Sequence, residues 1–289
     1  MVGDVMLDVT ARISSPLAYA SDTPAVVSMQ SGGSAANTAG WLAASGHRSA
    51  FVGRIGADDA GSRAREALAA QGVEAHLPVS AGRATGVCVV IVDALGERTM
   101  LPDPGANADL RADDIDGARV AAGDHVHLSG YVLLNPACAA AGLAILHTAR
   151  QAGATTSLDP SSAALLRSGQ DAMRAGLALV DLVIANEEEA EVLTGRRDPE
   201  AALAALAGLV PVAVVKCGAA GAMARAGMEQ VTAPARPAAV VDTTGAGDAF
   251  AAGFLPAWAG GLGLARALAA GLDLASVAVS RVGAGPPPR

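Results

Sequence analysis

Basic side chains are scarce in this chain, and lysine is nearly absent: of 20 Lys and Arg residues, only Lys216 is a lysine. The formal net charge is −8, and Lys and Arg form no cluster anywhere along the sequence. A protein that binds DNA or RNA needs a basic face to neutralise the phosphates. The composition therefore excludes nucleic acid as a partner.

Long apolar stretches are missing as well. Hydrophobic residues make up 52% of the chain, yet no uninterrupted run reaches the roughly 18 residues that a membrane span needs. The start, MVGDVMLD, lacks the basic and apolar segments of a secretory signal. The three cysteines, Cys88, Cys138 and Cys217, form no CxxC pair and favour neither a disulfide framework nor a zinc site. We expect a cytoplasmic protein without membrane contact.

Several common catalytic motifs do not occur. There is no GxxxxGK[ST], which excludes a P-loop, and no GxSxG or HExxH. No GxGxxG follows a strand, although a dinucleotide-dependent oxidoreductase stays open as an alternative because it would share the same alternation of strands and helices. His125 and His127 would lie on one face of a strand with no third ligand, so we expect structural roles for them.

What the chain does contain is a regular alternation of short apolar runs and Ala-rich helical patterns, which is typical of βαβ units and a mainly parallel sheet. The 289 residues suit one large α/β domain. Strands are expected at Ser49–Ile55, Gly86–Val92, His125–Ser129, Thr155–Asp159, Leu182–Ala185 and Val212–Cys217. Helices are expected at Ser34–Ser45, Ala60–Gln71, Cys138–Ala152, Glu187–Leu193, Glu200–Leu209, Gly247–Ala259 and Leu264–Val282.

Two stretches break this alternation. Residues 10–31 and about 78–106 have the pattern of short strands joined by turns, and Asp93–Gly96 resembles a hairpin tip. They predict a small sheet that stands away from the main layer.

The segment DTTGAGDAF, residues 242–250, follows Val240-Val241, which we interpret as the end of a strand, and continues into an apolar helix. Free amides at a helix N-terminus, together with the helix dipole, bind anions and most often phosphate. Asp248 in the first turn has two interpretations. It is either a helix-stabilising acid, worth about 1 kcal/mol, or a general base beside a bound phosphate.

A second glycine turn, Ser31–Ala39, also opens a helix, and Asn37 falls one turn inside it. An amide at that position can donate to and accept from a polyol. Taken alone, this segment indicates only a helix start.

The two glycine turns occur in one order with three other features: the Gly3–Asp8 segment, the turn at Gly56–Gly61 and the Asn186–Glu189 helix start. Together they resemble the ribokinase-like carbohydrate kinases, the PfkB family, over essentially the whole chain. DTTGAGDAF is the most specific of these motifs. The resemblance implies a single domain over residues 1–289, a three-layer α/β/α fold with a small β-sheet lid formed by residues 10–31 and 78–106, and a homodimer that pairs through the lid.

The resemblance also implies an ATP- and Mg²⁺-dependent kinase, with K⁺ as a further cofactor in many members, and it assigns roles to particular residues. Asp248 would be the base, and Gly245, Ala246 and Gly247 would supply amides to the transferring phosphoryl group. The sugar would contact Asp8, Gly32, Gly33 and Asn37. The nucleotide would contact Asn186, Lys216, Gly218 and Gly221. Glu189, with Asn186, would position Mg²⁺ through water, and Asp242 and Thr244, with the loop near residues 280–284, match the monovalent cation region.

Two departures bear on the substrate. Ser34 stands where ribokinase itself carries a lysine, and Ser161 stands where many relatives have Asn. Residues 10–31 contain one basic residue, Arg12, so a small unphosphorylated sugar or sugar acid is favoured. Tyr19 is the only aromatic residue in the lid segments, which disfavours a nucleoside kinase, the first alternative. A non-catalytic homologue is the other alternative, although it would have lost residues that this chain retains.

Overall fold

The structure, a computed structural model, describes residues 1–287. Its central sheet has the strand order β14-β13-β12-β11-β10-β9, and Val2 then bridges Leu128 of β9 to Val52 of β3, which pairs with β5. The strands from β9 to β12 are parallel, and β13 and β14 are antiparallel. These strands are β3 (Ala50–Val52), β5 (Glu74–His76), β9 (His125–Ser129), β10 (Thr155–Asp159), β11 (Leu182–Asn186), β12 (Val212–Lys216), β13 (Ala222–Ala226) and β14 (Glu229–Ala233).

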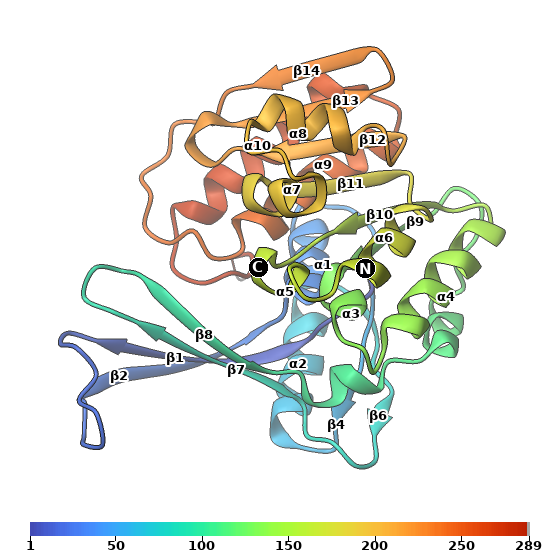
Figure 1. The fold of residues 1–289 in the computed structure, drawn as a ribbon. Helices are drawn as coiled ribbons and strands as arrows, with labels where there is room; N and C mark the ends of the chain where they lie inside the picture. The colour runs from blue at the N-terminus through green and yellow to red at the C-terminus, as the bar shows by residue number, and fades with distance from the viewer. Residues whose placement is uncertain (288–289) are drawn as a thin grey trace.

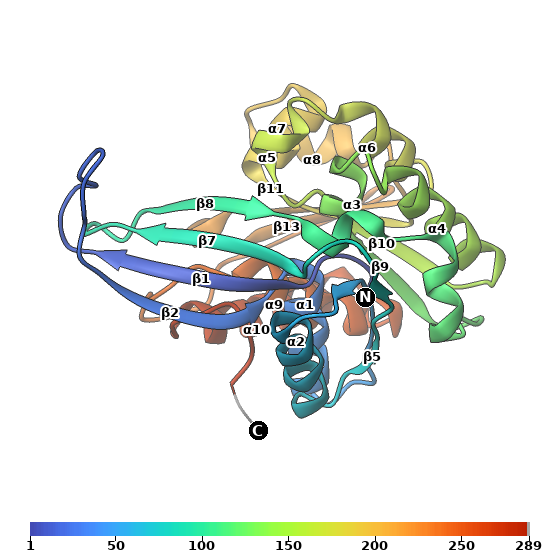
Figure 2. The same cartoon turned by 90° about the horizontal axis from the view of Figure 1, so that it is seen from below.

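Helices cover both faces of this sheet (Figure 1, Figure 2). One layer packs on β9–β12 and contains α3 (Gly130–Leu134), α4 (Ala139–Gln151), α5 (Ala163–Leu166), α6 (Gln170–Leu177), α7 (Glu187–Thr194) and α8 (Pro199–Leu206). The other contains α1 (Ser34–Ala44), α2 (Asp59–Ala70), α9 (Ala246–Ala259) and α10 (Leu264–Val279). Because both faces are covered, Val212–Val215 are all buried. The predicted three-layer α/β/α fold is confirmed.

A separate four-stranded sheet projects from one side of the domain (Figure 1); we call it the lid. Its order is β2-β1-β7-β8, with β1 parallel to β7 and the other pairs antiparallel. The strands are β1 (Met6–Ile13), β2 (Ala25–Gly32), β7 (Gly86–Val92) and β8 (Arg98–Asp103). Residues 78–85 lie outside this sheet, and Val79–Ser80 (β6) pairs instead with Ile55–Gly56 (β4).

The predicted strand end at Val240-Val241 is wrong. These residues form no strand and are 69% and 58% exposed, and the preceding strand ends at Ala233. Pro234 and Pro237, which lack an amide donor, separate the two segments. Within residues 1–287, no helix combines the length and apolarity needed to cross a membrane.

Candidate active site

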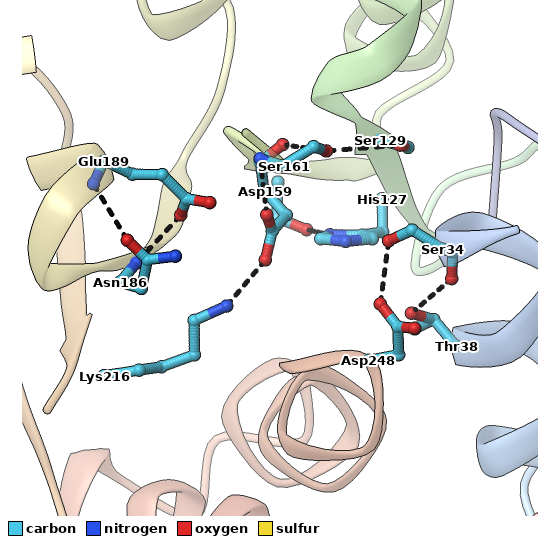
Figure 3. Close-up of polar contacts among 11 residues, drawn as sticks. Ser34, Thr38, His127, Ser129, Asp159, Ser161, Asn186, Glu189, Lys216 and Asp248 are labelled. Atoms are coloured by element: carbon cyan, nitrogen blue, oxygen red, sulfur yellow. Dashed lines mark hydrogen bonds and ion pairs between the residues drawn. The ribbon is translucent and has the colours of Figure 1, made fainter. Parts of the chain in front are cut away.

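Three parallel strands end at one edge of the sheet with a polar residue each: Asp159 on β10, Asn186 on β11 and Lys216 on β12. Ligands of open α/β sheets bind outside the carboxyl ends of the strands. The N-terminus of α9 and its first-turn residue Asp248 face the same edge (Figure 3). The strand ends and this helix start together define the candidate site.

Asp248 contacts two residues of α1 that precede it by more than two hundred positions in the sequence. Its Oδ1 accepts a hydrogen bond from Ser34 Oγ at 2.7 Å, and its Oδ2 accepts one from Asn37 Nδ2 at 3.2 Å. Burial raises the pKa of Asp248 to about 7, although the Ser34 hydrogen bond opposes the rise. The two glycine motifs therefore come together at one carboxylate with a pKa near neutrality.

Asp4, in the N-terminal segment, holds the turn that contains Ser34 through hydrogen bonds. Asp4 Oδ2 accepts from the Ser34 amide at 2.7 Å, and its Oδ1 accepts from Ser129 Oγ at 2.8 Å. Asp8, on β1, lies against Gly32: a Cβ at Gly32 would fall 2.1 Å from an Asp8 oxygen, so a larger residue there would displace the Asp8 carboxylate. Burial, followed by the charge of Asp4, raises the pKa of Asp8 to about 6.

The helix start at Gly245–Gly247 leaves backbone amides open. Gly245 has a φ of 72°, and a Cβ there would lie 2.4 Å from the Ala284 carbonyl oxygen. The Ala246 amide donates to the Thr243 carbonyl at 3.3 Å. Among the described residues, the amides of Gly247 and Asp248 have no partner, which is the arrangement of an anion site.

The ammonium group of Lys216 lies close to this helix start. Its Nζ lies 2.9 Å from Asp159 Oδ2 and 3.1 Å from the position that a Cβ on Gly247 would take. Burial alone would lower the pKa of Lys216, but Asp159 and then Glu189 raise it above its usual value. The only lysine in the chain therefore lies with its ammonium group beside the open amides, and Figure 3 shows its ion pair with Asp159.

Asn186 and Glu189 form a capping box at the start of α7. The Asn186 amide donates to Glu189 Oε2 at 2.9 Å, and the Glu189 amide donates to Asn186 Oδ1 at 2.8 Å. Burial and the charge of Asp159 raise the pKa of Glu189 to about 7, against the opposing effect of Lys216. Its Oε1 has no partner among the described residues, so this carboxylate has an oxygen left for a ligand.

The described residues contain no group of three or more His, Cys, Asp or Glu that could hold a metal ion by themselves. Mg²⁺ commonly takes only one or two protein carboxylates, with water and substrate phosphates completing its coordination. The free Glu189 oxygen beside Asp159 fits that mode.

Asp242 and Thr244 lie in the loop before α9. Asp242 Oδ1 accepts from the amide and hydroxyl of Thr244 at 2.8 and 2.6 Å, and Oδ2 accepts from the Gly283 amide at 3.0 Å. Arg98 of β8 also pairs with Oδ1, at 2.5 Å. The carboxylate predicted to hold a monovalent cation therefore already has partners at both oxygens.

The remaining nucleotide-site prediction concerns the turn after β12. Gly218 begins the short 3₁₀ helix Gly218–Ala220, and Gly221 follows it with a φ of 102°. A Cβ on Gly218 would meet open space. The two glycines thus flank an accessible turn next to Lys216, and their contact with nucleotide stays a prediction.

His125 and His127 make structural contacts, as expected. His125 bonds Thr155 Oγ1 at 2.9 Å and Ser157 Oγ at 2.7 Å, and His127 Nδ1 bonds the same Ser157 hydroxyl at 2.7 Å. Burial lowers the pKa of both rings, to about 3 and about 4. They line the sheet as neutral groups.

Four residues were not predicted as site residues: Asp4, Ser34, Asp159 and Arg98. Asp4 lies in the Gly3–Asp8 segment that carried the resemblance, and Ser34 was noted only as a departure from ribokinase. Asp159 ends a predicted strand, which is the position where a polar residue meets a ligand. No local sequence pattern marked Arg98 as a site residue, because its partner is 144 positions away.

Comparison with known proteins bears on this geometry. The family described as pfkB family carbohydrate kinase matches residues 1–289. The chain belongs to this family. An ATP-dependent ribose-1-phosphate kinase of Halopiger xanaduensis is 35% identical over 260 residues, which cover 89% of this chain and 83% of that protein. This PfkB-family chain is accordingly an ATP-dependent carbohydrate kinase.

Solved structures are similar over nearly the full length. An adenosine kinase from Sinorhizobium meliloti has a TM-score of 0.89 at 29% identity and covers 99% of this chain and 94% of its own. An Arabidopsis thaliana ribokinase, complexed with ribose and ATP, has a TM-score of 0.84 at 27% identity and covers 98% and 92%. The fold around the candidate site is therefore one that sugar and nucleoside kinases share.

Proposed function

We propose that this kinase transfers the γ-phosphoryl group of ATP to a hydroxyl of a small unphosphorylated sugar or sugar acid, with Asp248 as general base. The observation that carries this proposal is the environment of Asp248. Its only polar side-chain partners among the described residues are neutral, Ser34 and Asn37, and its pKa is raised to about 7 by burial. A carboxylate with that pKa accepts a proton from a hydroxyl near neutral pH.

The surroundings suit phosphoryl transfer, which depends on alignment and neutralisation of charge. As the acceptor oxygen bonds to the γ-phosphorus and the bond to the ADP oxygen breaks, the hydroxyl proton passes to Asp248. The amides of Gly247 and Asp248 and the ammonium of Lys216 would stabilise the negative charge on the phosphoryl oxygens. Gly245 and Ala246 set the turn that presents those amides.

Glu189 would hold Mg²⁺ through water, supported by Asn186, which fixes the Glu189 backbone and carboxylate in the capping box. When bound, Mg²⁺ neutralises phosphate charge during transfer. Lys216 lies at the phosphate end of the expected nucleotide site, and Gly218 and Gly221 would border the rest of the nucleotide.

The expected sugar pocket is acidic and rich in hydrogen-bonding groups. Asp8 and Gly32 come from lid strands, Gly33 precedes α1 and Asn37 lies in its first turn, and Asp4 adds a second carboxylate close to Asp8. Carboxylates and an amide bind hydroxyl groups well, and the carboxylates repel a phosphate. These charges favour an unphosphorylated substrate.

A sugar phosphate is the second candidate. Arg12 lies on the same face of β1 as Asp8, four residues further along, where alternate side chains share a face. The relative from Halopiger is named for ribose 1-phosphate. A nucleoside finds less support, since Tyr19 is 98% exposed in the loop after β1 and leaves no aromatic wall beside Asp8.

The experiment is ADP release from Mg·ATP with a panel of free sugars, sugar acids, sugar phosphates and nucleosides, for the wild type and Asp248→Asn. We expect one or a few free sugars to respond in the wild type and to fail in the variant. A response to sugar phosphates alone would show that the substrate is a phosphorylated sugar, and would leave the role of Asp248 as base unaffected. Equal rates in both proteins would overturn the role of Asp248.

A homodimer through the lid completes this proposal. The lid face opposite Asp8 carries Val27, Met29 and Leu101, which are 56%, 63% and 55% exposed. Apolar patches of this kind mark protein interfaces. Light scattering at working concentration should give twice the chain mass for the wild type and the monomer mass for Met29→Glu. A wild type with the monomer mass would overturn the proposed dimer.

A further inference from the structure

A half-buried ion pair joins the lid to the rest of the molecule. The Arg98 guanidinium, on β8, bonds Asp242 Oδ1 through Nη2 and approaches Thr243 Oγ1 through Nη1 at 3.5 Å. The side chains are 22% and 8% exposed, so water screens this pair less than a surface pair. An arginine from the lid therefore supplies the positive charge at the loop before α9.

This position is the one where the sequence predicted a monovalent cation. Bound K⁺ would need free oxygens on Asp242. Both oxygens already accept hydrogen bonds, from Thr244 and from the Gly283 amide, and the charge is balanced by Arg98. Two cations beside one carboxylate would repel each other. The residues present do not fit a potassium ion while Arg98 is in place.

A second lid strand lies against the segment after α10 that bonds this loop. A Cβ on Gly283 would lie 2.9 Å from Gln30 Oε1 of β2, so Gln30 lies directly against the residue whose amide bonds Asp242. Of the two edge strands of the lid, β8 therefore contacts the loop before α9 directly, and β2 contacts the segment that bonds Asp242. The loop continues through Thr244 into Gly245, where the open amides begin.

We infer that Arg98 replaces the monovalent cation of this site, so that the kinase needs no potassium and strand β8 of the lid helps to hold the loop before the phosphate-binding amides. Arg98 is a positioning residue: it acts through Asp242 and does not touch the reacting atoms. This inference rests on the proposed function for its activity readout.

The test compares four proteins in potassium chloride and in the same concentration of tetramethylammonium chloride: the wild type, Arg98→Ala, Arg98→Lys and Arg83→Ala. Arg83 forms the matched control pair, because its Nε lies 2.9 Å from Asp109 at an exposed site away from Asp242. Rates of ADP formation are measured with the responding sugar. Melting temperatures are measured in the same salts without substrate.

The wild type and Arg83→Ala should change less than about twofold between the salts. Arg98→Ala should lose about 10-fold in tetramethylammonium, within the 5- to 150-fold range of coupled sites, and potassium should restore most of that loss and raise the melting temperature of this variant alone. Arg98→Lys, which keeps the charge, should stay insensitive to potassium. Potassium stimulation of the wild type, full activity of Arg98→Ala, or failure of potassium to restore it would overturn the inference. If no sugar responds in the wild type, the proposed function fails, and the melting temperatures still test the role of Arg98.

Discussion

The two ends of the segment DTTGAGD carry the same side chain in opposite environments. Asp242 accepts two hydrogen bonds from Thr244 in its own loop and one from the Gly283 amide, and it pairs with Arg98; these contacts hold its pKa below the usual range against the effect of burial. Asp248 has two neutral donors, and burial raises its pKa to about 7. The comparison teaches that the surroundings, not the motif, suit Asp242 to hold a loop in place and Asp248 to the proposed role of base.

Removing the base should have the largest effect. Asp248→Asn should lower kcat by about 10²- to 10⁴-fold. The pKa of Asp248 is raised from 3.8 to about 7 in the folded state, so the folded protein loses stability as pH rises from about 4 to about 7, and the loss is complete above that. The variant should therefore melt at a higher temperature than the wild type at pH 8.

Asp198→Asn is the matched control, because Asp198 caps α8 through the Ala201 amide at 2.8 Å and lies outside the site. It should keep wild-type activity. If Asp248→Asn kept more than about a tenth of the activity, Asp248 would be a helix-stabilising acid like Asp198.

Neutralising Lys216 should have the next largest effect. Lys216→Met removes the ammonium beside Gly247 and should lower kcat by roughly 10²-fold, the usual cost of one group that stabilises transition-state charge. Lys216→Arg, which restores the charge with a different shape, should recover part of the loss. A loss confined to KM for ATP would show that Lys216 binds the nucleotide equally in the ground state and the transition state.

Changing Asp242 should have a smaller effect than changing Asp248 or Lys216, and it should not alter the pH dependence. Asp242→Asn weakens the pair with Arg98 and should lower kcat/KM about 10-fold, in the range of coupled sites. The pH dependence of the remaining activity should match that of the wild type, because Asp248 is unchanged. If the acidic limb of the pH profile of Asp242→Asn were shifted or missing, the two aspartates would not act independently.

The smallest effect is expected at Ser34. Ser34→Ala removes a hydrogen bond that lowers the pKa of Asp248, so the acidic limb of kcat/KM should move to higher pH by less than about one unit, since a neutral hydrogen bond contributes about 1 kcal/mol. Ser45→Ala is the control, because that hydroxyl bonds only the Trp41 carbonyl at the other end of α1. A limb that moves equally in both variants would contradict the role of Ser34.

Local patterns predicted much of the fold. Glycine turns gave the starts of α1 and α9, and buried apolar runs gave β9–β12. The strands β13 and β14 and the helices α3, α5 and α6 were not predicted, because Ala-rich segments such as Ala222–Ala226 have weak strand propensity and short helices depend on tertiary packing.

The candidate site was predicted where it depends on motifs and missed where it depends on distant pairs. The glycine turns pointed to Asp248 and Asn37. The pairs Lys216–Asp159 and Arg98–Asp242 join residues 57 and 144 positions apart, and no local pattern in one sequence encodes such a pairing. The lid register, which decides that Arg98 faces the loop, is likewise a tertiary property.

The pH dependence of kcat/KM in the wild type, from pH 5 to 9, tests the central claim most directly. If Asp248 is the base, it must be ionised to act, so kcat/KM should be level above about pH 7 and fall tenfold per unit below it. A profile that stays level down to pH 5 would show that the essential group titrates as an ordinary aspartate, and would contradict the assignment of Asp248 as the base.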